Sequence, residues 1–264
     1  MITLNDFDPR TPFLGQLAEE GKRPVLIVNT FVAPPDGVDA VIEVWRRDSE
    51  VMKMHSGLVS AQLYRGTGGS RVLTNVAVWE SAERLEHAFA SPEFQQLLPL
   101  YPEGSAAYPH LVRPVAVPGI CAGAPWGYSF DATTGHAAGG VSTIDFFELC
   151  PELTFESQLA ATDGPFTLLD IVIAPEGGVD TAIAAWGETT QFMRQRSGLL
   201  RADLYRGSAG SNVLINLAVW ESATALLEAV EDPGFTAVTG GYPPGCRCTR
   251  QAIAPVAVAG ICVA

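Results

Sequence analysis

Positive charge is scarce in this sequence, and no basic cluster is present. The chain has 16 Lys and Arg residues against 29 Asp and Glu residues, which gives a formal net charge of −13. Binding to nucleic acid or to an anionic membrane surface requires a basic patch, so both functions are excluded. An apolar run of about 18 residues, as a spanning helix needs, is also missing. The first residues, MITLNDFDPR, lack the basic and apolar regions of a secretory signal, and we expect a cytoplasmic protein.

Signatures of metal and nucleotide sites are missing as well. The five cysteines are odd in number and suit a reducing compartment, and the C-x-C at Cys246–Cys248 has no second cluster to complete a zinc site. The histidines, His55, His87, His110 and His136, lack the spacing of metal ligands. No G-x-G-x-x-G opens a helix after a strand, and neither G-x-x-x-x-G-K-[ST] nor G-x-S-x-G occurs. We therefore predict no metal, no dedicated nucleotide-binding fold and no hydrolase nucleophile turn.

An internal repeat dominates what is present. VLTNVAVWESA at Val72–Ala82 recurs as VLINLAVWESA at Val213–Ala223, 141 residues later. The same spacing relates PVAVPGIC at Pro114–Cys121 to PVAVAGIC at Pro255–Cys262. Two half-chains with one pattern share one fold. We predict one domain over residues 1–121, a Gly- and Ala-rich linker over 122–142, and a second domain over 143–264.

Each half has the pattern of a strand, a helix, two strands, a helix and a strand. Apolar periodicity, glycine punctuation and a Ser N-cap set these elements in the first half: Val25–Val32, Val38–His55, Leu58–Arg65, Val72–Trp79, Ser81–Ala90 and Leu111–Val117. This order is the ferredoxin-like unit, an open sheet with helices on one face. Two such sheets can cover each other. The predicted fold class is therefore α+β, with two fused ferredoxin-like (βαββαβ) units forming an intramolecular α+β barrel.

Asparagine and tryptophan share one face of a strand in both halves. Alternation along the strand places Asn75 with Trp79, and Asn216 with Trp220. An amide in an apolar sheet costs free energy unless it is paired. One interpretation is that each Asn satisfies a neighbouring backbone group. The other is that it holds a substrate oxygen while the Trp forms an aromatic wall.

Further candidates occupy repeated positions. Trp45 and Met52, with their repeats Trp186 and Met193, lie on apolar helix stripes and are assigned to substrate binding, as are Tyr64, Tyr205 and Arg196. His55, at the place of Arg196 in the other half, is a candidate proton acceptor or a residue at a helix end. The mid-strand Asp170 is a candidate for a raised pKa. Because His55, His87, Tyr108 and His110 are titratable, the first half is the favoured site.

The helix–SGL–strand arrangement and N-x-x-x-W-E-S-A-x-x-L resemble the antibiotic biosynthesis monooxygenase superfamily. In its small anthrone oxygenases, an Asn and a Trp at the places of Asn75 and Trp79 line the polyketide pocket. Two copies in one chain are similar to the ring-opening oxygenases of angucycline pathways (jadomycin, gilvocarcin and kinamycin types). That resemblance implies cleavage of a C–C bond in a dehydrorabelomycin-like polyketide by O2. It also implies reduced flavin (FADH2 or FMNH2) as co-substrate and a flavin reductase as partner, and it leaves a homodimer of the fused unit open.

Two alternatives remain open from the sequence. The first is a cofactor-free, anthrone-type oxygenase that forms a quinone without cleaving a ring. The second belongs to another class, a non-catalytic protein that binds a polyketide intermediate, since fold does not determine function.

Overall fold

The computed structural model describes residues 1–123, 130–131 and 144–263. Most of the predicted linker, 122–142, lies outside the described residues. The chain forms two compact units. Unit 1 consists of residues 1–112, 208–210 and 253–264, and unit 2 consists of residues 113–207 and 211–252. In the described part of the chain, no helix combines the length and the apolar character needed to cross a membrane.

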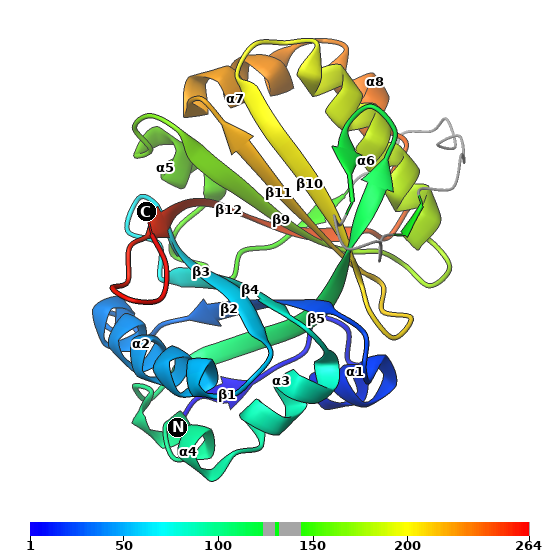
Figure 1. The fold of residues 1–264 in the computed structure, drawn as a ribbon. Coiled ribbons are helices and arrows are strands. Elements are labelled where there is room, and N and C mark those ends of the chain that lie inside the picture. The colour runs from blue at the N-terminus through cyan, green and yellow to red at the C-terminus, as the bar shows by residue number, and fades with distance from the viewer. Residues whose placement is uncertain (124–129, 132–143, 264) are drawn as a thin grey trace. The chain divides into compact units, whose positions relative to one another are not determined.

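Unit 1 contains the elements predicted for the first half, preceded by a short strand and a helix (Figure 1). Its elements in chain order are β1 (Thr3–Leu4), α1 (Phe13–Glu20), β2 (Val25–Val32), α2 (Val38–Met54), β3 (Leu58–Gly66), β4 (Val72–Trp79), α3 (Ala82–Phe89), α4 (Pro92–Gln95), the 3-10 helix η1 (Leu98–Leu100) and β5 (Ala106–Val117). The last strand begins five residues earlier than predicted, because Ala and Pro109 weaken the strand signal at 106–110.

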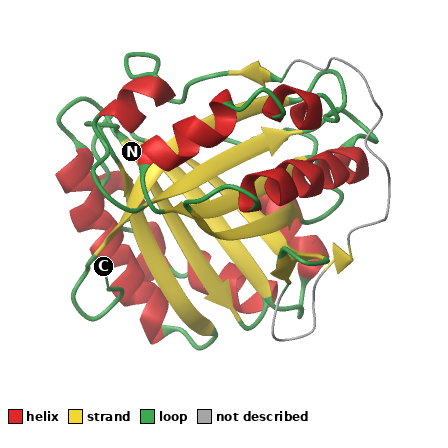
Figure 2. Ribbon diagram, turned by 90° about the horizontal axis from the view of Figure 1, so that it is seen from above, coloured by secondary structure: helices red, strands yellow, loops and turns green. Residues whose placement is uncertain are grey.

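Unit 2 repeats this order. Its elements are β6 (Cys121–Ala122), β7 (Phe130–Asp131), β8 (Asp145–Phe146), α5 (Phe155–Ala160), β9 (Phe166–Ile173), α6 (Val179–Arg194), β10 (Leu199–Gly207), β11 (Val213–Trp220), α7 (Ala223–Glu231), α8 (Phe235–Thr239) and β12 (Arg247–Val256). In each unit the helices lie against one face of the strands (Figure 2). Apolar residues of α6 and α7 pack on β9 and β11 in one continuous core.

The strand order confirms the predicted fold class. In unit 1 the order is β5-β2-β4-β3 followed by the end of β12, and in unit 2 it is the start of β12 followed by β9-β11-β10 and the end of β5. Because β5 and β12 each pair in both units, the order of eight strands closes on itself. The protein is therefore an α+β barrel built from two ferredoxin-like units.

The compact units divide the chain differently from the boundaries predicted at 121 and 143. Val115 and Val117, at the end of β5, belong to the core of unit 2. Val258, after β12, belongs to a core of unit 1. Each final strand thus begins in its own half and ends in the other unit. The sequence pattern does not show this, because a long apolar strand reads the same whichever strands it pairs with.

The repeat extends further toward the N-terminus than the sequence alignment shows. β1 pairs in parallel with β5, and β8 pairs in parallel with β12 at the repeated positions. Buried glutamines in the helices that follow confirm the equivalence. Gln16 Oε1 accepts the backbone N–H of Leu111 at 2.7 Å, and Gln158 Oε1 accepts that of Ala252 at 3.1 Å. The spacing here is 142 rather than 141 residues, so a one-residue gap hides the repeat.

The SGL motif marks the junction of helix and strand in both units. Gly57 and Gly198 have φ of 115° and 101°, a conformation that side chains disfavour. A Cβ atom at Gly57 would also lie 2.6 Å from Cβ of Arg84, and one at Gly198 would lie 2.3 Å from Cβ of Ala225. Glycine at this position therefore allows the second helix of each unit to pack closely against the chain turn.

Candidate functional site

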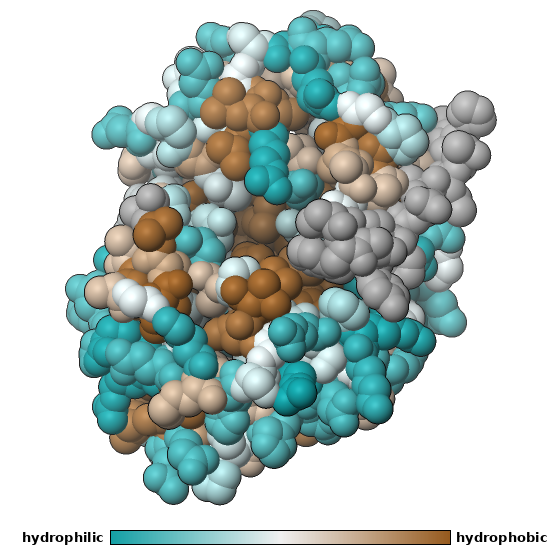
Figure 3. All heavy atoms as spheres, in the orientation of Figure 1, coloured by the Kyte–Doolittle hydropathy of each residue, from teal (hydrophilic) through white to brown (hydrophobic). Residues whose placement is uncertain are grey.

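A cavity with a volume of about 480 Å³ lies in unit 2. It is mostly apolar and is lined by residues of β9, β10, β11, β12, α5, α6, α7 and α8. Apolar side chains reach the surface over α7 and the strands beside it (Figure 3). A cavity of this size and character is typical of a binding site for a small organic molecule.

A pair of polar side chains projects into this cavity from neighbouring strands. Asn216 on β11 is directly opposite Asp170 on β9, and Asn216 Nδ2 donates a hydrogen bond to Asp170 Oδ2 at 2.7 Å. Both residues line the cavity. Burial raises the pKa of Asp170, and the hydrogen bond from Asn216 and the charge of Arg250 oppose that rise. Asp170 is therefore suited to accept a proton at a higher pH than an exposed aspartate does.

Three buried polar atoms of the cavity wall have no hydrogen-bond partner among the described residues. They are Asn216 Oδ1, Trp220 Nε1 and Thr189 Oγ1. An unpaired buried polar group costs about 1–3 kcal/mol, so such groups point to a polar partner inside the cavity. The indole N–H of Trp220 requires an acceptor, and the amide oxygen of Asn216 requires a donor. A phenol hydroxyl can satisfy either group, whereas a ketone oxygen can satisfy only the indole N–H.

The equivalent cavity of unit 1 is much smaller, at about 80 Å³. Its strand pair is Asn29 opposite Asn75, with no carboxyl group. Its acid comes instead from α2, where Asp48 accepts a hydrogen bond from the hydroxyl of Tyr101. Burial raises the pKa of Asp48 to about 7. The carboxyl that occupies this cavity therefore differs in position from the one in unit 2.

The 141-residue repeat shows which residues differ between the two cavities. Asp48 of unit 1 corresponds to Thr189 of unit 2, and Asn29 corresponds to Asp170. The tyrosine is kept, as Tyr242, and burial raises its pKa well above the ordinary value, with the charge of Asp170 adding to the effect. The cavity of unit 2 thus has a neutral hydroxyl where that of unit 1 has a carboxyl.

The structure places eight of the twelve predicted site residues on the two cavities. Trp186, Met193, Asn216 and Trp220 line the cavity of unit 2, and Trp45, Met52, Asn75 and Trp79 line that of unit 1. Within each unit the helix residues and the strand residues thus face the same space.

The other four predicted residues line neither cavity. Tyr64 on β3 is opposite Thr74, and Tyr205 on β10 is opposite Ile215. On each of these strands, the tyrosine is the immediate neighbour of the residue that is opposite the cavity asparagine. Successive side chains of a strand point to opposite faces, and the tyrosines therefore point away from the cavities.

The two candidates at the helix ends are also outside the cavities. His55 caps the C-terminus of α2, and its ring packs edge-to-face on His87 at 5.9 Å. Arg196 forms an ion pair with Asp232 at 2.8 Å and lies over the ring of Phe192. Their positions favour the helix-end interpretation that the sequence left open for His55.

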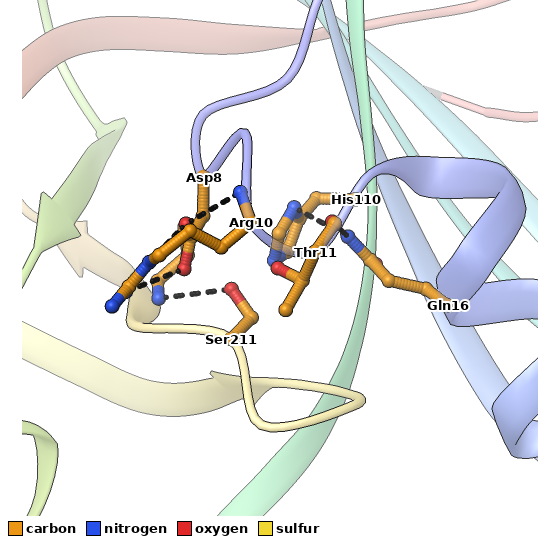
Figure 4. A network of polar contacts seen from close by, with 7 residues as sticks. Asp8, Arg10, Thr11, Gln16, His110 and Ser211 are labelled. Carbon is orange, nitrogen blue, oxygen red and sulfur yellow. Dashed lines mark hydrogen bonds and ion pairs between the residues drawn. The ribbon is translucent and has the colours of Figure 1, made fainter. Parts of the chain in front are cut away.

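The titratable residues that favoured the first half do not reach its cavity. None of His55, His87, Tyr108 and His110 lines it. His110 is fully buried beside α1, where Gln16 Nε2 bonds to its Nδ1 at 3.2 Å and to the carbonyl oxygen of Thr11 at 2.6 Å (Figure 4). Burial lowers the pKa of His110 to about 4. The structure thus favours unit 2 over the half that the sequence favoured.

Arg250, Cys248 and Tyr242 line the cavity of unit 2 but are not among the predicted site residues. Burial raises the pKa of the Cys248 thiol well above its ordinary value, so it is not a reactive thiolate. Two of the three carried a signal in the sequence, because Arg250 stands where the first half has Pro109 and Tyr242 repeats Tyr101. Among the described residues, no group of three or more His, Cys, Asp and Glu could hold a metal ion.

The protein thus has two ferredoxin-like units, and the second contains a mostly apolar cavity of about 480 Å³. Residues 24–99 match the sequence profile of the family described as Antibiotic biosynthesis monooxygenase (ABM), so the chain carries an ABM domain. The second half repeats the motifs of that domain, and the predicted resemblance to this superfamily is confirmed over residues 24–99. No curated protein matches the sequence.

Solved structures share this fold at low sequence identity. An anthrone oxidase-like protein is 16% identical with a TM-score of 0.59, over 88% of this chain and 92% of the other. A candidate monooxygenase from Fusobacterium nucleatum is 9% identical with a TM-score of 0.50, over 88% and 94%. SnoaB, a cofactor-independent oxygenase from Streptomyces nogalater, is 21% identical with a TM-score of 0.32, and 98% of its chain matches 37% of this one.

The expectation of reduced flavin is wrong. SnoaB is described as a cofactor-independent oxygenase, which conflicts with a requirement for FADH2 or FMNH2. A flavin reductase partner loses its support with it. The flavin came from the resemblance to ring-opening oxygenases and from no residue of this chain.

Proposed function

We propose that the cavity of unit 2 is the active site of an oxygenase that oxidises an electron-rich polycyclic phenol with O2 and without a cofactor. One observation carries the proposal. The 480 Å³ cavity presents an acid–amide pair, Asp170 and Asn216, together with the unpaired N–H of Trp220, whereas the 80 Å³ cavity of unit 1 has no acid on its strands.

Each side chain has a role that follows from its chemistry. Asp170 accepts the proton of the phenol, and Asn216 positions both the carboxyl group and the substrate oxygen. Trp220 Nε1 donates a hydrogen bond to the oxygen that becomes negative. Trp186 and Met193 provide apolar walls that exclude water.

The reaction needs no further reductant when an anthrone is the substrate. Removal of a proton by Asp170 gives an anion that transfers an electron to O2, and the two radicals combine to a peroxide anion at the ring carbon. The proton then returns from Asp170 and gives the hydroperoxide. Loss of water then breaks the O–O bond and the remaining C–H bond and leaves a carbonyl. The net change is that the CH2 carbon becomes C=O and one O2 yields one carbonyl oxygen and one water.

We propose that the substrate is an aromatic polyketide. Because two copies of the unit are present in one chain, we propose more specifically that the enzyme opens the B ring of an angucycline. The cofactor-free chemistry equally supports the anthrone-type alternative. Product mass distinguishes them, because quinone formation retains the carbon skeleton, whereas ring opening yields a carboxylate or an aldehyde. Binding without O2 consumption would indicate the non-catalytic alternative.

The test uses flavin-free protein, dithranol as the anthrone probe and an oxygen electrode. Asn216→Ala should lower O2 uptake by about 10²-fold, as expected for loss of one stabilising hydrogen-bonding group at an active site. Asn75→Ala, the matched substitution in unit 1, should leave the rate unchanged. Equal rates for Asn216→Ala and the wild type would refute the proposal, as would a loss confined to Asn75→Ala.

A further inference from the structure

Arg250 provides the positive charge among the residues that line the cavity of unit 2. It lies on β12, and its guanidinium carbon is 4.1 Å from the ring centre of Phe146 and 4.5 Å from that of Phe155. The two rings fix the plane of the guanidinium by cation–π contact. The charged group is therefore held in place at the cavity rather than extended into solvent.

The partner of Arg250 in the described part of the chain is weak. One N–H group lies 3.5 Å from Glu156 Oε1, and the side chain of Glu156 is 71% exposed. An exposed ion pair at this distance contributes little binding energy. A guanidinium carries several N–H donors in a rigid fork, so donors remain for a ligand.

Other charges face Arg250 as well. The positive charge of Arg250 opposes the rise in the pKa of Asp170 that burial causes, so the two groups interact electrostatically inside unit 2. A balancing role for Asp170 is the structural alternative, but the Asp170 carboxyl is held by the hydrogen bond from Asn216 at 2.7 Å, whereas the guanidinium of Arg250 is held against the rings of Phe146 and Phe155. The position is also specific to this unit, because Pro109 occupies it in unit 1.

We propose that the ligand of this cavity carries a carboxylate and that Arg250 binds it. The inference rests on the proposed function and adds a substituent to its substrate class. A guanidinium fork matches the two oxygens of a carboxylate, and such charge-assisted pairs are about twice as strong as neutral hydrogen bonds. Arg250 then determines specificity at the edge of the cavity, while Asp170, Asn216 and Trp220 contact the reacting end of the ring system.

The chain offers a closely matched control. Arg247 is on the same strand, its guanidinium carbon is 4.7 Å from the ring centre of Phe147, and its Nε lies 3.6 Å from Asp145 Oδ2. Arg247 does not line the cavity. Arg247→Gln therefore removes the same charge and the same kind of ring contact without altering the site.

The experiment measures Kd by titration calorimetry for anthracene carboxylate and for the neutral anthracene carboxamide with the same ring position. Wild-type protein should prefer the carboxylate by about tenfold, as a charge-assisted pair predicts. Arg250→Gln should abolish the preference and keep carboxamide binding, and Arg247→Gln should retain the preference. Retained carboxamide binding also shows that the variant is folded.

The contrary outcomes separate this inference from the proposed function. The carboxylate site is wrong if the wild type binds both probes with equal affinity, or if Arg247→Gln loses the preference for the carboxylate as Arg250→Gln does. Either result would still be compatible with an aromatic ligand in this cavity. Failure of both probes to bind overturns the cavity as an aromatic site, and the carboxylate inference with it. Hydroxyanthracene serves as a third probe. If its affinity rises as it ionises and only Arg250→Gln abolishes that rise, the anion is a phenolate and the carboxylate assignment is wrong.

Discussion

Asp170 and Asn216 are joined by a hydrogen bond of 2.7 Å across two strands of unit 2, and their counterparts in unit 1 are the uncharged pair Asn29 and Asn75. Both pairs occupy the same register of the same fold. Duplication has therefore kept the backbone and changed the chemistry, which is the relationship on which the proposed function rests.

Replacing Asp170 by Asn should remove the proton acceptor and keep the shape of the cavity. Since burial raises the pKa of Asp170, O2 uptake by the wild type should rise with pH above the range in which an exposed aspartate ionises. Asp170→Asn should lower the rate by about 10²–10⁴-fold, as loss of a general base does, and should remove that inflection. A pH–rate profile on dithranol checks this. An unchanged profile would rule out Asp170 as the base.

Thr189→Asp should give unit 2 the side chain that occupies the cavity of unit 1. The new carboxyl would lie near Tyr242, as Asp48 lies near Tyr101, and would add a buried acid to the cavity wall. We expect the affinity for anthracene carboxamide to fall by about tenfold, because burying an acid against an aromatic ligand costs free energy. The matched change, Asp48→Thr in unit 1, should leave that affinity unaltered. If calorimetry showed the same affinity for Thr189→Asp as for the wild type, residue 189 would not face the bound ligand.

Asp48 should make the protein less stable as the pH rises. Its pKa is about 7 in the folded protein and 3.8 in an exposed chain, so between these values the folded state binds more protons than the unfolded state does. The stability contributed by this group is therefore present near pH 4 and is lost as the pH rises to 7. Asp48→Asn should remove this dependence and increase stability relative to the wild type at pH 7–8, by on the order of 4 kcal/mol. Urea denaturation at several pH values measures it, and parallel curves for the two proteins would disprove the burial of an ionisable Asp48.

His110 should have the opposite effect on the pH dependence of stability and make the protein less stable as the pH falls. Its pKa is lowered to about 4 from 6.5, so the unfolded state binds more protons between these values. The stability contributed by His110 is present above pH 6.5 and is lost as the pH falls to 4. This loss is on the order of 3 kcal/mol. His110→Gln, which installs the residue found at the equivalent position 251, should flatten this part of the profile. Denaturation of the Asp48→Asn protein with and without His110→Gln isolates the effect, and no difference between them would show that His110 is accessible to protons in the fold.

The sequence predicts the fold well because its evidence is local and repeated. Strand alternation and the helix stripe occur twice at one spacing, so both ferredoxin-like units follow from it. The exchange of the ends of β5 and β12 does not, since it depends on pairing between residues far apart in the chain. The repeat of α1 as α5 is hidden by a one-residue gap and by few shared side chains, of which Gln16 and Gln158 are the informative ones.

The candidate site is predicted in part for the same reason. Asn216 and Trp220 share a face of one strand, and alternation alone brings them together. Tyr205 required the register between two strands, which places it opposite Ile215 and away from the cavity. To predict that Arg250 lines the cavity would require knowing that β12 packs beside α5. Cytoplasmic location and a homodimer of the fused unit stay predictions.

The position of a bound product analogue tests the central claim most directly. A crystal structure of the protein with dihydroxyanthraquinone should show the ring system in unit 2, against Trp220, with one of its oxygens within hydrogen-bond distance of Asn216. Occupancy of the unit 1 cavity beside Trp79, or of neither cavity at a concentration that supports O2 uptake, would contradict the account.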